Sequence, residues 1–140
     1  MIPQFNRRGY LPAGIHPAHE DEVFSRFCSG NPRREELGIN LRKFLQFARS
    51  CGIARFLLDG SFVTDKTEPA DYDCIIVVPS TFDEDDIYAD LLSSPREMKK
   101  SYSADAYVVN ESDGKLLDWW IDFFGTDRSG YSKGIVEVAL

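Results

Sequence analysis

The residues best suited to chemistry are two aspartates, Asp71 and Asp73, at the start of the strongly apolar segment 72–78. Side chains alternate along a β-strand, so residues two apart project from the same face. Two carboxylates placed in this way repel each other and lose hydration unless a positive charge joins them. A divalent cation such as Mg²⁺ suits them because it prefers oxygen ligands. The alternative is that both acids lie in solvent at the strand start and have no role.

A turn and a third acid could complete a site around this pair. Gly60 and Ser61 closely follow the short apolar segment 53–58. Glycine permits close backbone approach, and backbone amides together with a serine hydroxyl bind anions. Asp105 stands between two alanines in another segment with the pattern of a strand. If these strands are neighbours, three carboxylates and a phosphate-binding turn meet at one end of the sheet.

The elements that must position these residues follow from the hydrophobic pattern. Asn31 and Pro32 are typical of a helix N-cap followed by a first-position proline, and apolar residues then recur at steps of three and four. The apolar, β-branched segment 72–78 is typical of a strand buried on both faces in the middle of a sheet. The predicted strands are 53–58, 72–78, 104–109 and 134–138, and the predicted helices are 19–27, 32–51, 83–92 with 95–100 as a candidate extension, and 116–124.

Helices that interleave with about four strands predict a mixed α/β (α+β) fold. The 140 residues are enough for one domain, so we expect a single domain over 1–140. Two prolines and two glycines between Gly9 and Pro17 predict an extended N-terminal arm at about 1–18.

Composition narrows the function classes. Sixteen basic and 23 acidic side chains give a net charge of −7, which disfavours nucleic-acid binding through many phosphate contacts. No apolar run approaches the roughly 20 residues needed to cross a bilayer, and the N-terminus lacks a signal-peptide pattern, so we predict a soluble, cytoplasmic protein without a membrane partner. The three cysteines predict reduced thiols. His16 and His19 lack a third ligand in the sequence and are a weak metal signal.

The spacing of Gly60, Ser61, Asp71, Asp73 and Asp105 resembles that of the nucleotidyltransferase superfamily, which includes DNA polymerase β and the small bacterial nucleotidyltransferases. The resemblance covers roughly residues 53–109. It implies a nucleotidyltransferase-like domain in which the Gly-Ser turn holds the triphosphate of an NTP, with ATP as the expected nucleotide. It also implies that the three acids bind Mg²⁺ or Mn²⁺, and that the third acid helps to activate an acceptor hydroxyl.

The chain also resembles an uncharacterised family of small bacterial proteins through its Gly-Ser-Phe-Val-Thr turn and its segment Gly125-Thr126-Asp127-Arg128. That resemblance implies no activity. Many minimal nucleotidyltransferases continue the Gly-Ser turn with Ala-Arg-Gly, whereas residues 62–66 read Phe-Val-Thr-Asp-Lys. Thr64 and Lys66 are therefore candidates for nucleotide binding, with Lys66 replacing the charge of the missing arginine but not its bidentate geometry.

The C-terminal loop and an aromatic helix leave further alternatives open. Arg128 and Lys133 either fold back over phosphates or an acceptor, or lie in solvent on a turn before the last strand. The aromatic residues around Trp119 span more than one helical face, so Trp119 either packs in the core or stacks on a base or a partner.

The resulting hypothesis is transfer of a nucleoside monophosphate from an NTP to a hydroxyl acceptor, with release of pyrophosphate. The acceptor is a protein side chain, an RNA end or a small molecule such as an aminoglycoside, and the acidic charge makes RNA the less favoured of these. The alternative is a catalytically weakened binding module that acts as an antitoxin-like or assembly partner. Nucleotide binding without transfer is an intermediate case. A metal-dependent phosphohydrolase is a weaker alternative because the sequence has no histidine cluster near the acids.

Overall fold

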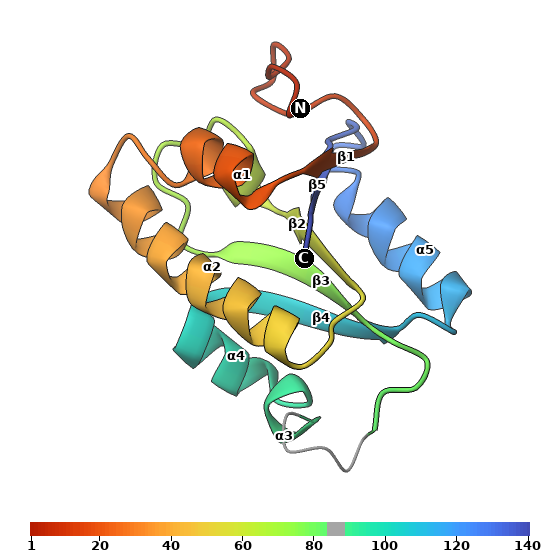
Figure 1. Ribbon diagram of the computed structural model, residues 1–140. Helices are drawn as coiled ribbons and strands as arrows, with labels where there is room; N and C mark the ends of the chain where they lie inside the picture. The colour runs from red at the N-terminus through yellow and green to blue at the C-terminus, as the bar shows by residue number, and fades with distance from the viewer. Residues whose placement is uncertain (84–88) are drawn as a thin grey trace.

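A five-stranded mixed sheet forms the centre of the computed structural model, which describes residues 1–83 and 89–140 (Figure 1). Its strand order is β1-β5-β2-β3-β4. β1 is parallel to β5 and β3 is parallel to β4, whereas β2 runs antiparallel to both β5 and β3. The strands are β1 (Ile15–Ala18), β2 (Arg55–Asp59), β3 (Tyr72–Val78), β4 (Ala104–Asn110) and β5 (Ile135–Val138).

Helices cover the sheet unequally, with α1, α2 and α4 on one face and α5 alone on the other (Figure 1). A single 3₁₀ turn, η1, follows β2 directly. The prediction of a mixed α/β fold is confirmed, with five strands in place of about four. The helical elements are α1 (Glu20–Phe27), α2 (Pro32–Ser50), η1 (Ser61–Val63), α3 (Ala89–Leu92), α4 (Pro95–Tyr102) and α5 (Gly114–Phe124).

Local capping sets the start of the principal helices. The Asn31 side chain accepts a hydrogen bond from the Arg34 amide at 2.9 Å, with Pro32 in the first turn, as the sequence predicts. The Ser94 side chain accepts a hydrogen bond from the Glu97 amide in the same way, with Pro95 in the first turn, so α4 begins anew and does not extend the preceding helix. Of the helix predicted over 83–92, residues 84–88 lie outside the described residues, and the remainder contains α3.

The end of the predicted N-terminal arm is a strand. Residues 15–18 form β1, whose first residue, Ile15, pairs with Ile135 of β5. The segment has no alternating apolar pattern and contains Pro17, so it lacks the local signal of a strand. Proline is tolerated here because β1 is an edge strand. The pairing partner lies at the other end of the chain, which is why the sequence pattern does not reveal it.

The core has two parts, one on each face of the sheet. The larger part lies under α1, α2 and α4, where Phe44 is fully buried against Phe56 and Tyr102. The smaller part lies under α5, around Ile75, Val77 and neighbouring residues. β3 contributes to both parts and pairs on both sides, which confirms its prediction as a buried interior strand. Within the described parts of the chain, no helix has the length and apolar character needed to cross a bilayer.

Candidate functional site

The register of three strands brings acidic side chains together at one end of the sheet. Asp73 of β3 lies directly opposite Asp59 of β2 on one side and Asp105 of β4 on the other. Directly paired residues share a face of the sheet, and Asp71 shares it by alternation along the chain. The face is that of Ile75, which packs under α5. The expected convergence of the strand acids therefore occurs on the face that a single helix covers.

The carboxylates of Asp71, Asp73 and Asp105 form a compact cluster. Each offers an oxygen, and these oxygens all lie within 4.8 Å of one another, from side chains that are all half-buried. This spacing allows the three residues to share a divalent cation, whose ligands would be carboxylate oxygens and water. Among the residues that the structure describes, no other group of three such side chains is close enough to hold a metal ion.

Asp59 adds a fourth carboxylate that the sequence analysis did not select. Its side chain is 1% exposed, and neither carboxylate oxygen has a hydrogen-bond partner among the described residues. Burial, followed by the negative charge of Asp73, raises the pKa of Asp59 well above its ordinary value. An unpartnered buried carboxylate is costly in an ordinary core, so packing alone does not explain Asp59. In the sequence, the position of Asp59 between the apolar Leu58 and Gly60 could have pointed to it.

Asp73 stands at the centre of the acidic group and responds to it. Burial and then the negative charges of Asp71 and Asp105 raise its pKa from 3.8 to about 6, while Lys133 and Lys99 act in the opposite direction. Its carboxyl therefore gains a proton more readily than an ordinary aspartate. A bound cation would remove that penalty, because it neutralises the charge that the neighbours oppose.

Gly60 lets the backbone pass directly beside Asp73. Its φ of +81° is in the region that favours glycine, and a Cβ at this position would lie 2.1 Å from Asp73 Oδ2. The next residue, Ser61, begins the short helix η1. The predicted turn after β2 therefore exists, and its close contact with the acidic cluster requires glycine.

Lys99 of α4 is a second residue that sequence reasoning missed. Its Nζ contacts Asp71 and lies 2.9 Å from Asp105 Oδ2. Partial burial lowers the pKa of Lys99, but the hydrogen bonds and charges of Asp71 and Asp105 raise it overall. Lys99 thus neutralises part of the acidic cluster from within the chain. The contact joins α4 to the starts of β3 and β4. The spacing of residues within one element therefore could not predict it.

Thr64 and Lys66 lie in the loop after η1 and are not part of the acidic cluster. The Thr64 hydroxyl donates to Ser61 O at 2.6 Å and accepts from the Lys66 amide at 3.2 Å, so it closes the turn after η1. The Lys66 side chain is exposed, and the lysines that lower the pKa of Asp73 are Lys133 and Lys99. Thr64 therefore supports the Gly60–Ser61 turn from within the loop.

A buried arginine holds this loop against α2. Arg34 is 7% exposed, and its guanidinium donates to four backbone carbonyls. The acceptors are Phe27 O, Phe62 O, Thr64 O and Lys66 O. Because charge-assisted hydrogen bonds are the strongest of their class, Arg34 fixes the course of the chain just after Ser61.

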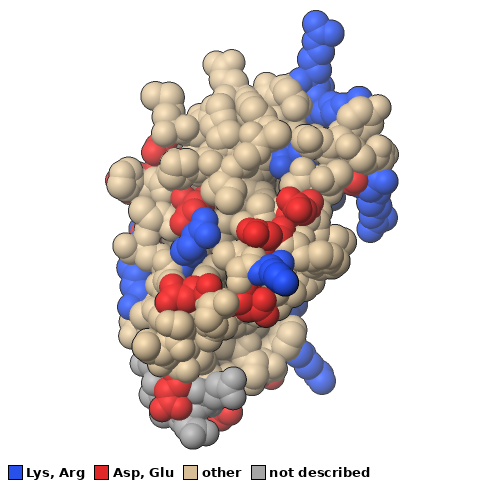
Figure 2. All heavy atoms as spheres, turned by 90° about the vertical axis from the view of Figure 1, so that its right-hand side faces the viewer, with Lys and Arg blue, Asp and Glu red and all other residues tan. Residues whose placement is uncertain are grey.

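The C-terminal loop and α5 line a cavity that opens on the acidic cluster. It has a volume of about 480 Å³ and includes Asp73, and both Arg128 and Lys133 line it. The loop is ordered by Asp127, which accepts hydrogen bonds from Tyr10 Oη at 2.8 Å and from the amides of Ser129 and Tyr131. Figure 2 shows the α5 side of the molecule, where acidic side chains gather around basic ones near the middle of the face.

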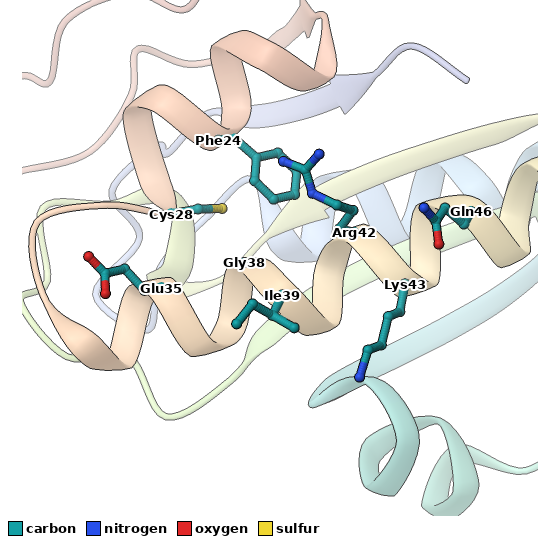
Figure 3. Close-up of a pocket in the computed structure, with 8 residues that line it drawn as sticks. All are labelled: Phe24, Cys28, Glu35, Gly38, Ile39, Arg42, Lys43 and Gln46. Atoms are coloured by element: carbon teal, nitrogen blue, oxygen red, sulfur yellow. The ribbon is translucent and has the colours of Figure 1, made fainter.

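A second cavity, of about 320 Å³, lies on the outer side of α2, and its lining is less suited to catalysis (Figure 3). Cys28 and Gly38 line it, and the Arg42 guanidinium lies 4.2 Å from the ring centre of Phe24. Burial raises the pKa of the Cys28 thiol to about 12, which keeps it protonated and unsuited to nucleophilic attack. α1 and α2 belong to the opposite face of the sheet from the acids.

The histidine pair does not form a metal centre with other described residues. The His16 ring nitrogen Nε2 lies 2.6 Å from Pro12 O, and the potential metal-binding group of the described chain consists of aspartates alone. His16 therefore has a structural partner in the segment before β1.

The comparisons with known proteins identify a family but no activity. Neither a curated protein nor a solved structure matches the chain. Residues 3–139 match a protein family described as "Family of unknown function (DUF6932)". The match covers β1 to β5 and all the residues of the acidic site. The chain therefore belongs to this family of unknown function.

Proposed function

We propose that this protein is a metal-dependent nucleotidyltransferase that uses Mg²⁺ or Mn²⁺ and takes an NTP as its donor. The observation that carries the proposal is the convergence of Asp71, Asp73 and Asp105 within 4.8 Å. The unpartnered, buried carboxylate of Asp59 beside them supports it independently. The three clustered aspartates concentrate negative charge that a scaffold does not need and that a bound cation would offset.

The groups around the acids suit a polyphosphate. Gly60 brings the backbone of the turn next to Asp73, and Ser61, with its hydroxyl, follows as the first residue of η1. Lys133 and Arg128 line the adjoining cavity and supply positive charge opposite the cluster. A phosphate chain could thus be held between the turn, the basic side chains and a metal ion on the aspartates, which is a recurring arrangement in phosphoryl chemistry.

In the proposed reaction the oxygen of an acceptor hydroxyl attacks the α-phosphorus of the NTP. The bond from that phosphorus to the oxygen bridging the α- and β-phosphates breaks, and its electron pair leaves with pyrophosphate. The acceptor hydroxyl proton passes to a carboxylate of the cluster, for which Asp105 at its edge is the candidate. Bound metal ions would supply charge stabilisation to the entering and leaving oxygens.

A second candidate function follows from Lys99. This side chain already contacts Asp71 and Asp105, and so provides an internal cation where a metal ion would otherwise be needed. A chain with such a contact could act as a binding module for a partner protein without nucleotidyl transfer. The two functions differ in whether the acids bind a divalent ion in preference to Lys99.

Calorimetric titration with a non-hydrolysable ATP analogue, in the presence and absence of Mg²⁺ or Mn²⁺, tests the proposal. We expect metal-dependent binding by the wild-type protein and its loss in Asp73→Asn. Asp118→Asn is the matched control, because it makes the same charge change at an exposed position of α5. Absence of metal-dependent binding in a folded wild-type sample would contradict the transferase and favour the binding module.

A further inference from the structure

We infer that the cavity between the C-terminal end of α5 and the sheet is the site for the base and ribose of the bound nucleotide. This inference rests on the proposed function, because it extends the same site outward from the metal cluster. Asp73 lines the cavity and also belongs to the cluster, so the cavity adjoins the cluster at this residue. A molecule whose phosphates lie at the aspartates would place its remaining part here.

The aromatic side of the cavity is built for stacking. Phe123 and Phe124 both line it, yet Phe123 is 55% exposed whereas Phe124 is buried. The ring of Phe123 stacks on Trp119 at 5.4 Å with an interplanar angle of 13°. It also meets the rings of Phe124 and Trp120 edge-on. These neighbours hold the Phe123 ring in one orientation while more than half of its surface faces solvent, as a base-stacking platform requires.

The charged residues of the lining offer binding partners to a nucleotide. Lys133 lowers the pKa of Asp73 through its charge, and it lines the cavity together with Arg128, so the cavity offers positive charge to a phosphate. Asp122, the residue before Phe123, adds carboxylate oxygens that can accept hydrogen bonds from an amino group of a base or from ribose hydroxyls. The cavity lining thus includes cations, hydrogen-bond acceptors and aromatic rings. These groups suit the phosphate, sugar and base of a single ligand.

The size of the cavity agrees with this occupant. Its volume of about 480 Å³ lies in the range of roughly 300–1,000 Å³ that small-molecule sites occupy. The cavity on α2 is smaller and lies on the face opposite the acidic cluster. The α5 cavity combines contact with the cluster at Asp73 and an exposed aromatic ring at Phe123.

The first test compares two ligands on the unaltered protein in the presence of Mg²⁺. Inorganic tripolyphosphate has the phosphate chain alone, whereas a non-hydrolysable ATP analogue adds the ribose and base. We expect the ATP analogue to bind about tenfold more tightly, and to change the fluorescence of Trp119 through its stacked neighbour Phe123. Equal affinity for the two ligands would overturn the inference and leave the metal site intact.

The second test removes the platform. Phe123→Ala should weaken binding of the ATP analogue about tenfold, equivalent to about 1.4 kcal/mol, and leave tripolyphosphate binding unchanged. Phe123→Trp should retain binding of the analogue because it keeps an aromatic face. Leu116→Ala is the control, since Leu116 is exposed on the same helix but does not line the cavity.

The outcomes separate the two proposals. If tripolyphosphate binds with Mg²⁺ and Phe123→Ala leaves the affinity for the analogue unchanged, the base site is wrong and the proposed function stands. If neither ligand binds the wild-type protein, both proposals are overturned. If the analogue binds without metal but still depends on Phe123, the base site stands and the metal-dependent function fails.

Discussion

The two faces of the sheet are built from the same strands but differ in what their side chains do. On the face covered by α1, α2 and α4, alternate residues of β2, β3, β4 and β5 are apolar, and they pack into the larger core. On the face covered by α5, β2, β3 and β4 also carry apolar residues, but at one end of the sheet they carry Asp59, Asp73 and Asp105. The first face contributes the larger part of the apolar core. The second face has a smaller core and carries the charged aspartates.

The length of α5 contributes to this difference. Its 11 residues rise about 16 Å in a helix. The seven residues of β4 extend about 23 Å in a strand. A single helix of this length cannot cover the full length of the strands, whereas three helices share the other face. The uncovered end is where the acids and the cavity with Phe123 lie.

The largest expected effect is a difference in stability between two variants, each of which replaces a phenylalanine on one face of the sheet. Phe44→Ala removes a fully buried ring that packs against Phe56 and Tyr102. It should lower the free energy of unfolding by about 3–5 kcal/mol. Phe123→Ala, at an exposed ring, should lower it by less than about 1 kcal/mol. Urea unfolding of both variants measures the difference, and similar losses would show that the α5 face is as important for stability as the other.

The next effect concerns the turn at the open end. Gly60→Ala should lower the free energy of unfolding by about 2 kcal/mol and weaken Mg²⁺ binding, because its Cβ would collide with Asp73 at a positive φ. Gly52→Ala is a matched control, since Gly52 also has a positive φ but its Cβ would meet no atom. Thermal unfolding and metal titration of both variants check this. Equal behaviour of the two would contradict the close contact between the turn and the acid.

The acidic end of the sheet should also make the free energy of unfolding depend on pH. This effect should be no larger than that of Gly60→Ala. The pKa of Asp73 in the folded protein is about 6, above its ordinary value of 3.8. Between these pH values the folded protein binds more protons than the unfolded chain, so the metal-free protein should lose stability as pH rises from about 4 to about 6.

Asp73→Asn should reduce that loss and raise the free energy of unfolding at pH 7. We expect a gain of about 1 kcal/mol, because solvent at this half-buried site screens part of the repulsion. Chemical unfolding from pH 4 to pH 7, without metal, measures it. A wild-type stability that rises over this range, or a variant that is less stable at pH 7, would show that the acids are not under repulsion.

The smallest expected effect tests the competition between Lys99 and a metal ion. Lys99→Met removes the cation that contacts Asp71 and Asp105, so Mg²⁺ should bind about threefold more tightly. Lys100→Met is the control, because Lys100 is a neighbouring exposed lysine on α4. Calorimetric titration with Mg²⁺ compares them. Weaker metal binding in Lys99→Met alone would mean that Lys99 positions the carboxylates for the metal and does not compete with it.

Local patterns in the sequence were sufficient for the elements and for part of the site. The cap at Asn31 and the apolar spacing behind it predicted α2, and the continuous apolar run predicted β3 as an interior strand. Alternation along a strand placed Asp71 and Asp73 on one face before any pairing was known. These features depend on residues a few positions apart, whose relation is set by the regular geometry of helix and strand.

Other features depend on contacts between distant parts of the chain, and only the tertiary structure determines them. β1 exists because residues 15–18 pair with β5, more than a hundred residues later. Asp59 is buried opposite Asp73 by the β2–β3 register, and Lys99 reaches Asp71 across 28 positions. Phe123 and Asp73 line the same cavity because α5 folds back over the sheet. The sequence by itself determined which residues share a strand or helix face, because that follows from backbone periodicity. The packing of those faces decided which charges meet, because pairing and burial depend on the whole chain.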